Sequence, residues 1–332
     1  MRKATGDIVA NGLLQGAEVE SKRLRKGFFF EMRRHGALYS MFLPGAIFLL
    51  VFAYLPMVGL VIPFKYITYS NSFWSTLFDS KWVGFYNFQF FWDSPDLYRI
   101  MRNTIGYNVI NIVLGLVIAV SVAIALNEIR NRKSAKTYQT IMFMPYFLSW
   151  VIVGYLAYAF LSPNGFINMG ILKPFGIEQI SFYTDPKYWP FILIFFAHWK
   201  GTGYGVIIYL AAIAGQDQSL YEAAAIDGAS RGQQIRKIMI PLLKPMMIIL
   251  TILAVGGIFS SDFGLFYNVP LNQGVLKETT DVINTYVYNA LMSSGDISLS
   301  AAVGLFQSVL GFFMVVGVNW IAGKIDPESK LF

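Results

Sequence analysis

The 332-residue sequence contains no cysteine and only two histidines, His35 and His198. The absence of cysteine excludes disulfide bonds, thiolate metal sites and a cysteine nucleophile, although it does not identify a cellular compartment. The two histidines are far apart and neither lies in an H-E-x-x-H arrangement, so a zinc hydrolase has no support. A G-x-x-x-x-G-K-[ST] phosphate loop and a G-x-S-x-G nucleophile elbow are also missing. We therefore predict a non-catalytic chain that does not itself handle ATP.

Charged residues are scarce as well, at 14% of the chain against 55% hydrophobic and 17% aromatic residues. This composition is too apolar for a soluble enzyme of this length. Six charge-poor runs are each long enough to cross a hydrocarbon core of about 30 Å. They cover residues 41–64, 104–126, 138–161, 188–214, 245–266 and 300–321. We predict an all-α polytopic membrane protein with six transmembrane helices, the first of which acts as a signal anchor.

The distribution of lysine and arginine predicts the orientation of these helices. Of the 26 basic residues, 18 fall on one side of the six runs and seven on the other. This positive-inside bias places both termini in the cytoplasm and explains the net charge of +7 without nucleic acid. We divide the chain into a cytoplasmic N-terminal segment (1–40), a transmembrane domain (41–321) and a cytoplasmic tail (322–332). Within the first segment, the basic and aromatic stretch at 22–35 is expected to lie along the inner lipid surface.

Aromatic residues are dense in the loops on the opposite side, as in the stretch WVGFYNFQFFW at 82–92. Such residues usually form an aromatic belt at the membrane interface. Their number in loops of this length also fits a docking surface for a partner outside the cell membrane, and both interpretations stay open.

The inner loop at 215–244 contains the most informative motif. Ser219 and Glu222 read S-x-x-E, the capping box that begins a helix. Three alanines continue this helix, and Gly228 can end it in a left-handed conformation. Ser230 and Gln233 form a further capping box.

We expect Pro241 to interrupt the segment that begins at Ser230, because proline lacks a backbone N–H. The loop is therefore predicted to form two short helices at an angle. A short, alanine-rich helix that is capped at both ends and projects from the membrane suits a socket in another protein.

The segment Glu222 to Pro241 (EAAAIDGASRGQQIRKIMIP) resembles the cytoplasmic EAA loop of ABC-importer permeases. The matching positions are Glu222, Ala223, Ala224, Gly228, Ile238 and Pro241, and Ile240 stands where leucine is usual. The likeness extends from Met41 onward through W-V-G-x-x-N-F at 82–88, R-N-T at 102–104, L-N-E at 126–128 and T-D-V at 280–282. Together these pieces resemble the carbohydrate branch related to maltose permeases, and most closely the polysaccharide and alginate-oligosaccharide type.

The resemblance implies a type I importer permease fold in the bacterial cytoplasmic (inner) membrane. It implies that this chain forms half of a translocation pathway, pairs with a second, similar permease and rests on two ATPase subunits. A periplasmic or extracellular solute-binding protein would deliver the substrate, expected to be an oligosaccharide and, more finely, an anionic uronate-type one. ATP and Mg²⁺ would bind to the ATPase subunits, and no cofactor is expected in this chain. Membrane lipid is a further expected partner.

The resemblance also implies that the loop helix is a coupling helix, which fits a cleft of an ATPase subunit and transmits its motion. The residues assigned to this contact are Ser219, Glu222, Ala223, Ala224, Asp227, Gly228, Ser230, Ile238 and Pro241. Two of them have alternative explanations. Glu222 could serve only the capping box within the chain, and Asp227 could be a solvated charge.

Polar and aromatic residues inside the spans are candidates for the substrate path, namely Asn108, Asn111, Trp199, Lys200 and Gln307. On the second span, Asn103, Thr104, Tyr107, Asn108 and Asn111 recur at helical spacing. Such side chains either form interhelical hydrogen bonds or contact a ligand, and the same alternatives apply to Gln307 with Ser308.

Lys200 lies within a predicted span, where a cation is costly in lipid and must face protein or water. It either pairs with Asp262 or lines the cavity as a cation that favours an anionic sugar, with Trp199 beside it.

Two other functions stay open at this point. An ABC permease for a peptide or an amino acid would share the same loop, and a transport assay would separate it from a sugar permease. A secondary transporter or channel would need ion-coupling carboxylates near the middle of several spans, and the predicted spans contain only Asp262.

Overall fold

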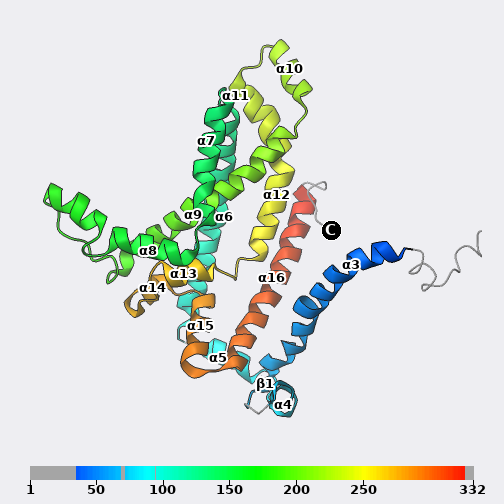
Figure 1. Ribbon diagram of the computed structural model, residues 1–332, viewed down its shortest axis with the longest axis vertical. Helices are drawn as coiled ribbons and strands as arrows, with labels where there is room; N and C mark the ends of the chain where they lie inside the picture. The colour runs from blue at the N-terminus through cyan, green and yellow to red at the C-terminus, as the bar shows by residue number, and fades with distance from the viewer. Residues whose placement is uncertain (1–34, 69–71, 94, 326–332) are drawn as a thin grey trace, which may run out of the picture. The chain divides into compact units, whose positions relative to one another are not determined.

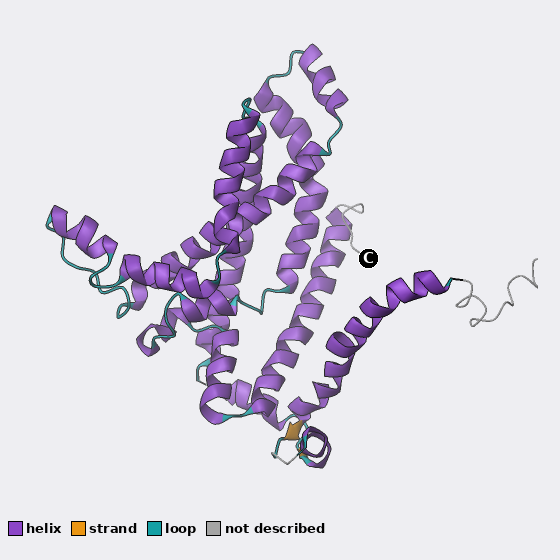
Figure 2. Ribbon diagram, in the orientation of Figure 1, coloured by secondary structure: helices purple, strands orange, loops and turns teal. Residues whose placement is uncertain are grey.

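The computed structural model describes residues 35–68, 72–93 and 95–325. The chain forms two units, Met1–Val61 and Ile62–Phe332. Regular structure in the described residues is almost entirely helical, and its one sheet has two short strands (Figure 2). The predicted all-α class is therefore confirmed. The predictions for residues 1–34, including nearly all of the basic stretch at 22–35, and for residues 326–332 lie outside the described residues.

The elements of the first half of the described chain are α3 (Gly36–Leu49), a π-helical turn (Leu50–Tyr54), a 3₁₀ stretch (Leu55–Phe64), β1 (Lys65–Tyr66), α4 (Phe73–Asp79), β2 (Lys81–Trp82), α5 (Tyr86–Asp93), α6 (Leu97–Asn127), α7 (Arg132–Phe143), a 3₁₀ turn (Met144–Phe147) and α8 (Trp150–Leu161). Those of the second half are a π-helical turn (Ile167–Leu172), 3₁₀ turns (Lys173–Phe175 and Pro186–Tyr188), α9 (Trp189–Ala214), α10 (Gln218–Ile226), α11 (Arg231–Gln234), a π-helical turn (Ile235–Met239), α12 (Ile240–Gly256), α13 (Phe263–Asn268), a 3₁₀ turn (Gly274–Leu276), α14 (Lys277–Thr280), α15 (Ile283–Ser294) and α16 (Ile297–Ile325).

Five continuous helical stretches among the described residues are long and apolar enough to cross a membrane. They are Gly36–Phe64, Leu97–Asn127, Pro186–Ala214, Arg231–Gly256 and Ile297–Lys324. A sixth span is obtained if the bent pair Arg132–Phe147 and Trp150–Leu161 counts as one. The helices agree with the six predicted runs in number and order.

The third predicted run, 138–161, is sharply bent. Its two helical parts meet at an angle of 100° across a short break. Leu148 and Ser149 adopt extended backbone there, and the Ser149 hydroxyl accepts the N–H of Ile152 at 3.3 Å. Ser149 is thus the N-cap of a new helix, α8, and this local signal outweighs the continuous apolar pattern.

The predicted bounds of the fifth run, 245–266, are wrong at both ends. The apolar helix covers Arg231–Gly256, and a separate short helix, α13, follows after a turn. Asp262 begins α13 by accepting the N–H of Leu265 at 3.3 Å. The sequence GGIFSSD at 256–262 combines glycines that end a helix with an aspartate that begins one, and hydropathy alone does not detect this.

Pro241 does not interrupt the helix that begins at Arg231, contrary to prediction. The five residues before α12, Ile235–Met239, adopt π-helical hydrogen bonding, and Pro241 then falls in the first turn of α12. A proline in a first helical turn removes no intrahelical hydrogen bond, and its fixed φ suits the helix. The loop therefore contains one short helix followed by a long one.

In the second unit, α6, α9 and α12 pack against one another, and α16 packs against α12 (Figure 1). Small residues allow the close approach. A Cβ at Gly203 of α9 would overlap the backbone of Met142, and a Cβ at Gly311 of α16 would lie 2.7 Å from the carbonyl oxygen of Gly256. The expectation that Gly256 marks close packing in the membrane is confirmed.

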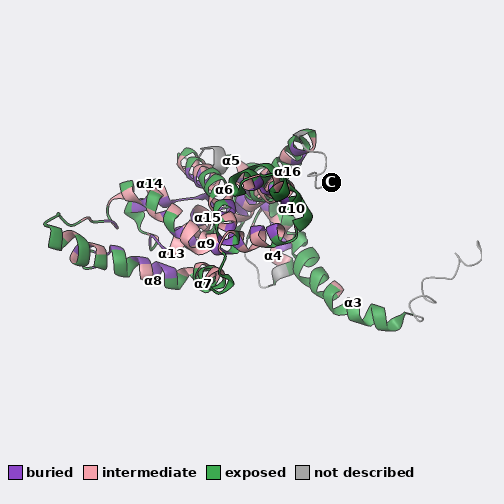
Figure 3. Cartoon of the chain, turned by 90° about the horizontal axis from the view of Figure 1, so that it is seen from above, coloured by how far each residue is buried: buried purple, intermediate pink, exposed green. Residues whose placement is uncertain are grey.

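The helix α10 lies at one end of this unit, and α5 and α15 lie at the opposite end (Figure 1). In the view by burial, α10 is largely exposed whereas α9 and α15 carry buried residues (Figure 3). The strands β1 and β2 pair antiparallel, with Lys65 opposite Trp82. Trp82 is exposed and stacks on Phe64 at 5.7 Å, which fits either interpretation of the aromatic loop.

Candidate functional site

The helix α10 begins two residues earlier than predicted and with a different cap. Its N-cap is Asp217, whose Oδ1 accepts the backbone N–H of Ser219 at 2.9 Å. Hydrogen bonds from the backbone and then the side chain of Ser219 lower the pKa of Asp217. The predicted capping box of Ser219 and Glu222 is wrong, because aspartate is as good an N-cap as serine and lies two residues earlier. Glu222 is exposed on the helix surface and does not serve that box.

The end of α10 is the one that the sequence predicts. Asp227 is the C-cap, and Gly228 adopts φ +79°. The N–H of Gly228 donates to the carbonyl of Ala225 at 3.1 Å, and that of Ala229 to the carbonyl of Ala224 at 2.9 Å. This pair of bonds is the Schellman motif, which satisfies the last carbonyls of a helix and fixes the direction of the chain beyond it.

One side of α10 is anchored to the rest of the unit. Tyr221 is 9% exposed and belongs to the core cluster that contains Ile213 of α9 and Met239. Its hydroxyl donates to Gln216 Oε1, and Gln216 Nε2 donates to the Met239 carbonyl at 3.3 Å. Burial raises the pKa of Tyr221. A displacement of α10 must therefore move the ends of α9 and α12 with it.

The other side of α10 is open. Ile226 is 87% exposed, and Glu222, Ala223 and Asp227 are exposed with it, whereas Ala224 is half-buried. An isoleucine this exposed beside small side chains leaves an apolar tip uncovered within the chain, as at many protein–protein contacts.

The second predicted capping box is confirmed. The Ser230 hydroxyl accepts the N–H of Gln233 at 3.4 Å, and Gln233 Oε1 accepts the N–H of Ser230 at 2.7 Å. Arg231, the first residue of α11, lies 3.6 Å from the carboxylate of Glu128. Since Glu128 belongs to the L-N-E piece and Arg231 to the EAA segment, the structure brings these two parts of the resemblance together.

The last two residues assigned to the loop lie away from the tip of α10. Ile238 is half-buried and packs against the core cluster of Tyr221 and Met239, and Pro241 is exposed in the first turn of α12. Ile238 therefore supports the base of α10 from within.

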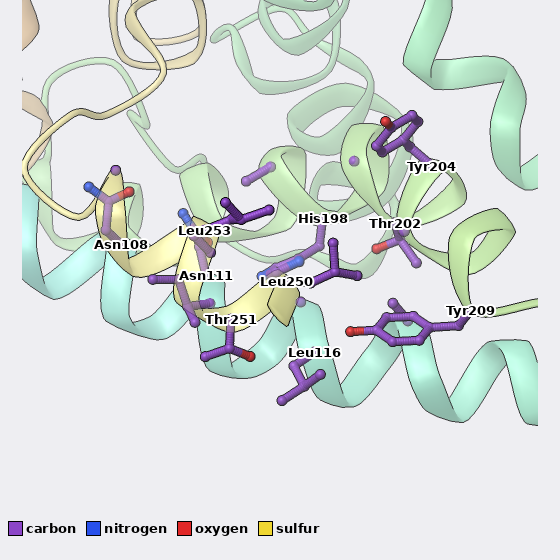
Figure 4. Close-up of a pocket in the computed structure, with 18 of the residues that line it drawn as sticks. Asn108, Asn111, Leu116, His198, Thr202, Tyr204, Tyr209, Leu250, Thr251 and Leu253 are labelled. Carbon is purple, nitrogen blue, oxygen red and sulfur yellow. The ribbon is translucent and has the colours of Figure 1, made fainter. Parts of the chain in front are cut away.

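A cavity of about 550 Å³ lies between α6, α9 and α12 (Figure 4). Its polar lining comes from Asn108 and Asn111 of α6, His198 and Thr202 of α9 and Thr251 of α12. Two of the five predicted path residues, Asn108 and Asn111, are thus brought together. The rest of the lining is largely apolar or glycine.

Two polar atoms of this cavity are buried without a hydrogen-bond partner among the described residues. They are Asn111 Oδ1 and His198 Nε2, and both side chains point into the cavity in Figure 4. Buried polar atoms without partners are uncommon and mark places where a ligand or water binds. The sequence analysis missed His198 as a path residue, although it lies two positions before Lys200 on the same predicted span.

The other polar residues of α6 form interhelical hydrogen bonds. Asn108 Nδ2 donates to the Ile258 carbonyl at 2.8 Å, and Tyr107 donates to the Thr279 carbonyl at 2.7 Å. Asn103 donates to two carbonyls of the 277–283 segment, and Thr104 Oγ1 accepts the N–H of Ile283 at 3.0 Å. Asn103, Thr104 and Tyr107 therefore hold the end of α6 against that segment.

Gln307 lies apart from Asn108 and Asn111, against another cavity between α12 and α16 that Ser308 also lines. Its Nε2 donates to the carbonyl of Phe259 at 2.7 Å. This bond gives Gln307 a contact between helices, which is one of the two predicted alternatives.

Lys200 and Trp199 are not among the residues that line the cavity of Figure 4. Lys200 Nζ donates to the carbonyl of Tyr146 at 3.0 Å and lies over the rings of Tyr146 and Trp150, 5.2 and 5.1 Å from their centroids. The expected Lys200–Asp262 pair is absent from the ion pairs of the described residues. Asp262 instead accepts the indole N–H of Trp150 at 2.7 Å, so Trp150 lies between the two charges. Trp199 borders an apolar groove with Phe196.

Among the described residues, no group of three or more His, Cys, Asp or Glu is placed to hold a metal ion. The apolar helices, the polar cavity between three of them and the exposed capped helix define an integral membrane protein of the permease class.

Comparison with known proteins agrees with this class. Residues 111–327 match the family described as the binding-protein-dependent transport system inner membrane component, and the chain belongs to this family. Its members are membrane subunits of ABC importers that work with a solute-binding protein and with ATPase subunits. The permease subunit is non-catalytic, and ATP hydrolysis resides in the ATPase subunits.

Two relatives from Bacillus subtilis (strain 168) are similar over nearly the whole chain. Protein LplB is 36% identical over 299 residues, which are 90% of this chain and 92% of LplB. The polygalacturonan/rhamnogalacturonan transport system permease protein YteP is 33% identical over 313 residues, which are 94% of this chain and 96% of YteP.

A solved structure has the same fold. A chain of a bacterial alginate ABC transporter, in complex with an alginate pentasaccharide-bound periplasmic protein, superposes with a TM-score of 0.79 at 31% identity. The match covers 90% of this chain and 98% of that chain. The expected type I importer permease fold is confirmed.

Proposed function

We propose that this permease carries oligosaccharides, that α10 is the segment that contacts an ATPase subunit, and that the cavity between α6, α9 and α12 is part of the substrate path. The names of YteP and of the alginate transporter support a saccharide as the transported solute. Both of those saccharides are acidic, so the substrate class that we propose is an acidic oligosaccharide.

The observation that carries the role of α10 is its combination of a fixed base and an exposed tip. Tyr221 anchors the helix to the ends of α9 and α12, and Ile226 is 87% exposed at the other end of the helix. An ATPase that closes around the tip would therefore move the transmembrane helices as rigid bodies. We assign Glu222, Ala223, Asp227 and Ile226 to this contact.

We propose that α10 faces the cytoplasm together with both chain termini. The positive-inside bias supports this orientation. The complete importer would contain a second, similar permease, two ATPase subunits that bind ATP and Mg²⁺, and bound membrane lipid. No cofactor is required of this chain for that role.

In the cavity, Asn111 Oδ1 and His198 Nε2 would accept hydrogen bonds from saccharide hydroxyl groups. Both atoms lie in the lining, are buried and lack partners among the described residues. Lys200 already uses one N–H on the Tyr146 carbonyl. We propose that its remaining N–H groups meet the carboxylate of a uronate sugar as it passes.

The first experiment tests α10. The full importer is reconstituted in vesicles, and uptake and ATP hydrolysis are measured together for Glu222→Lys and Ile226→Asp. We expect both variants to insert normally and to lose uptake per ATP hydrolysed. The control is Glu178→Lys, which reverses an exposed carboxylate outside α10. Full coupling in both α10 variants would refute the proposed contact.

The second experiment tests the substrate. ATP hydrolysis by the complex with its binding protein is measured while acidic and neutral oligosaccharides of equal length are supplied. We expect acidic oligosaccharides to stimulate hydrolysis more, and Lys200→Met to reduce this preference. Equal uptake of charged and neutral sugars by Lys200→Met would remove Lys200 from the proposal, and stimulation by peptides alone would remove the saccharide.

A further inference from the structure

A different polar cavity, of about 500 Å³, lies at the base of α10. Several helix ends meet around it. Its lining includes Asn127 and Ala214, the last residues of α6 and α9, and Arg132, Gln218 and Arg231, the first residues of α7, α10 and α11, together with Tyr221. Two guanidinium groups, two amides and a phenol thus border one space.

The positive charge of this cavity is incompletely balanced by the protein. Among the described residues, Arg132 forms no ion pair. Arg231 Nε lies 3.6 Å from Glu128 Oε2, too far for a good hydrogen bond, and Arg231 Nη1 donates to Gln234 Oε1 at 3.0 Å. Glu128 is not among the residues that line the cavity. Two cations that border one cavity repel each other, and an anion between them relieves this repulsion.

The chemistry of the lining suits a phosphate group. A guanidinium presents several N–H donors in a planar fork that matches phosphate oxygens, and such charge-assisted bonds are stronger than neutral ones. Gln218 and Asn127 add amide donors, and the Tyr221 hydroxyl lies beside them. Since arginine is charged at all relevant pH values, the site is available throughout the physiological range.

The position of the cavity indicates where the phosphate comes from. Asn127 and Ala214 end two of the stretches that are long and apolar enough to span a membrane. A cavity at the ends of two spans lies at the level of the lipid headgroups. Arg130, Lys133 and Lys136 follow in the adjoining sequence and add attraction for an anionic surface.

We propose that this cavity binds the phosphate group of an anionic phospholipid, and that Arg132 and Arg231 hold it at the base of α10. The assignment to the cytoplasmic leaflet rests on the proposed orientation, whereas the site itself does not. A bound headgroup joins α7 to α11 across the base of α10 and so holds that base in place.

The test uses the full-length chain, purified in an uncharged detergent and stripped of lipid. Native mass spectrometry measures the affinity for phosphatidylglycerol and for phosphatidylcholine with the same acyl chains. The variants are Arg132→Gln and Arg231→Gln, and the control is Lys133→Gln, which neutralises the next residue of α7, one that does not line the cavity. The thermal midpoint of each variant without lipid shows whether it is folded.

We expect the wild-type chain to prefer phosphatidylglycerol and each arginine variant to bind it about tenfold more weakly, as the loss of one charge-assisted contact predicts. Lys133→Gln should retain most of the affinity. Equal binding of the two lipids by the wild-type chain, or an equal loss in Lys133→Gln, would overturn the proposal.

Glu128→Gln provides a test whose sign separates this site from a merely structural ion pair. Without the Glu128 carboxylate, Arg231 is freer to bind phosphate, so we expect tighter binding of phosphatidylglycerol. A structural role of the Arg231–Glu128 pair predicts weaker binding instead, and that result would count against the site.

Inorganic phosphate and glycerol 3-phosphate distinguish a lipid headgroup from a free phosphate. Binding of these soluble anions that depends on both arginines, without a preference between the two lipids, would overturn the lipid assignment. Because this experiment needs neither ATPase nor transport, its failure would leave the proposed role of α10 in place. Loss of coupling in α10 variants likewise says nothing about the headgroup.

Discussion

The side-chain amide of Asn103 donates to the backbone carbonyl of Asp281 at 2.9 Å and so joins α6 to a segment 178 residues further along the chain. The same amide donates to the carbonyl of Glu278 at 3.0 Å, and Arg102 forms an ion pair with Glu278 at 2.9 Å. The R-N-T and T-D-V pieces that carried part of the resemblance are therefore two halves of one contact. This contact explains these pieces through the fold, without substrate.

Removal of the Asn103 amide should destabilise the permease. Asn103 is 7% exposed, and Asn103→Ala would leave the carbonyls of Glu278 and Asp281 without their donor. An unsatisfied buried polar group costs about 1–3 kcal/mol. We expect a lower thermal midpoint in detergent than for Val113→Ala, a substitution at a 55% exposed position of the same helix. Equal midpoints would show that the contact contributes little.

The stability contributed by Asp281 should depend on pH. Burial raises the pKa of this carboxyl above its ordinary value of about 3.9, although Thr285 and Arg99 act in the opposite direction. A raised pKa means that the folded chain binds the proton more tightly than the unfolded chain. The contribution is therefore full at low pH and declines as the pH rises above about 4.

Asp281→Asn cannot ionise, and it should gain stability relative to the wild-type chain between about pH 4 and pH 7. Thermal midpoints of both chains across this range measure the difference. Asp79→Asn, at an exposed position outside the spans, controls for the change in net charge. A difference that shrinks with rising pH would contradict the assigned direction.

Gly228 should tolerate no Cβ, because its φ is +79°. An L-residue in this conformation costs roughly 1–2 kcal/mol, and the strain falls on the end of the helix that we assign to the ATPase contact. We expect Gly228→Val to hydrolyse ATP with reduced uptake in the reconstituted importer. Gly232→Ala is the matched control, since its φ is not positive and a Cβ there would have open space. Equal defects in both variants would argue against backbone strain as the cause.

Gly203 should be required for the packing of α9. A Cβ at this position would overlap the backbone of Met142, whereas a Cβ at Gly201 of the same helix would have open space. Overpacking of this kind costs about 1–3 kcal/mol. Gly203→Ala should lower the thermal midpoint clearly and Gly201→Ala only slightly. The interpretation fails if Gly201→Ala is the more damaging substitution.

The ends of the loop helix illustrate how far local sequence signals reach. The left-handed Gly228 and the Ser230–Gln233 box were predictable, because each depends on residues within one turn. The start of α10 was predicted at Ser219 although Asp217 forms the cap, because two good capping residues lie close together and sequence alone does not decide between them. The path through Pro241 was missed because a π-helical turn before it accommodates the proline.

The substrate path shows the larger limit. Five residues were predicted for it, and the structure brings Asn108 and Asn111 into one cavity but places Gln307, Trp199 and Lys200 elsewhere. His198 joins that cavity from a different helix. Which side chains of two helices face each other depends on their rotation and crossing, and hydropathy does not record either.

The sequence by itself determined the membrane class, the number and order of the spans and the position of the exposed helix, because these follow from the length of apolar runs and from caps that act within one turn. The tertiary structure decided which polar residues only hold helices together, where the third span bends, and that Arg132 and Arg231 border one cavity. Those features depend on contacts between residues about 100 or more positions apart, and such contacts form only when the helices pack.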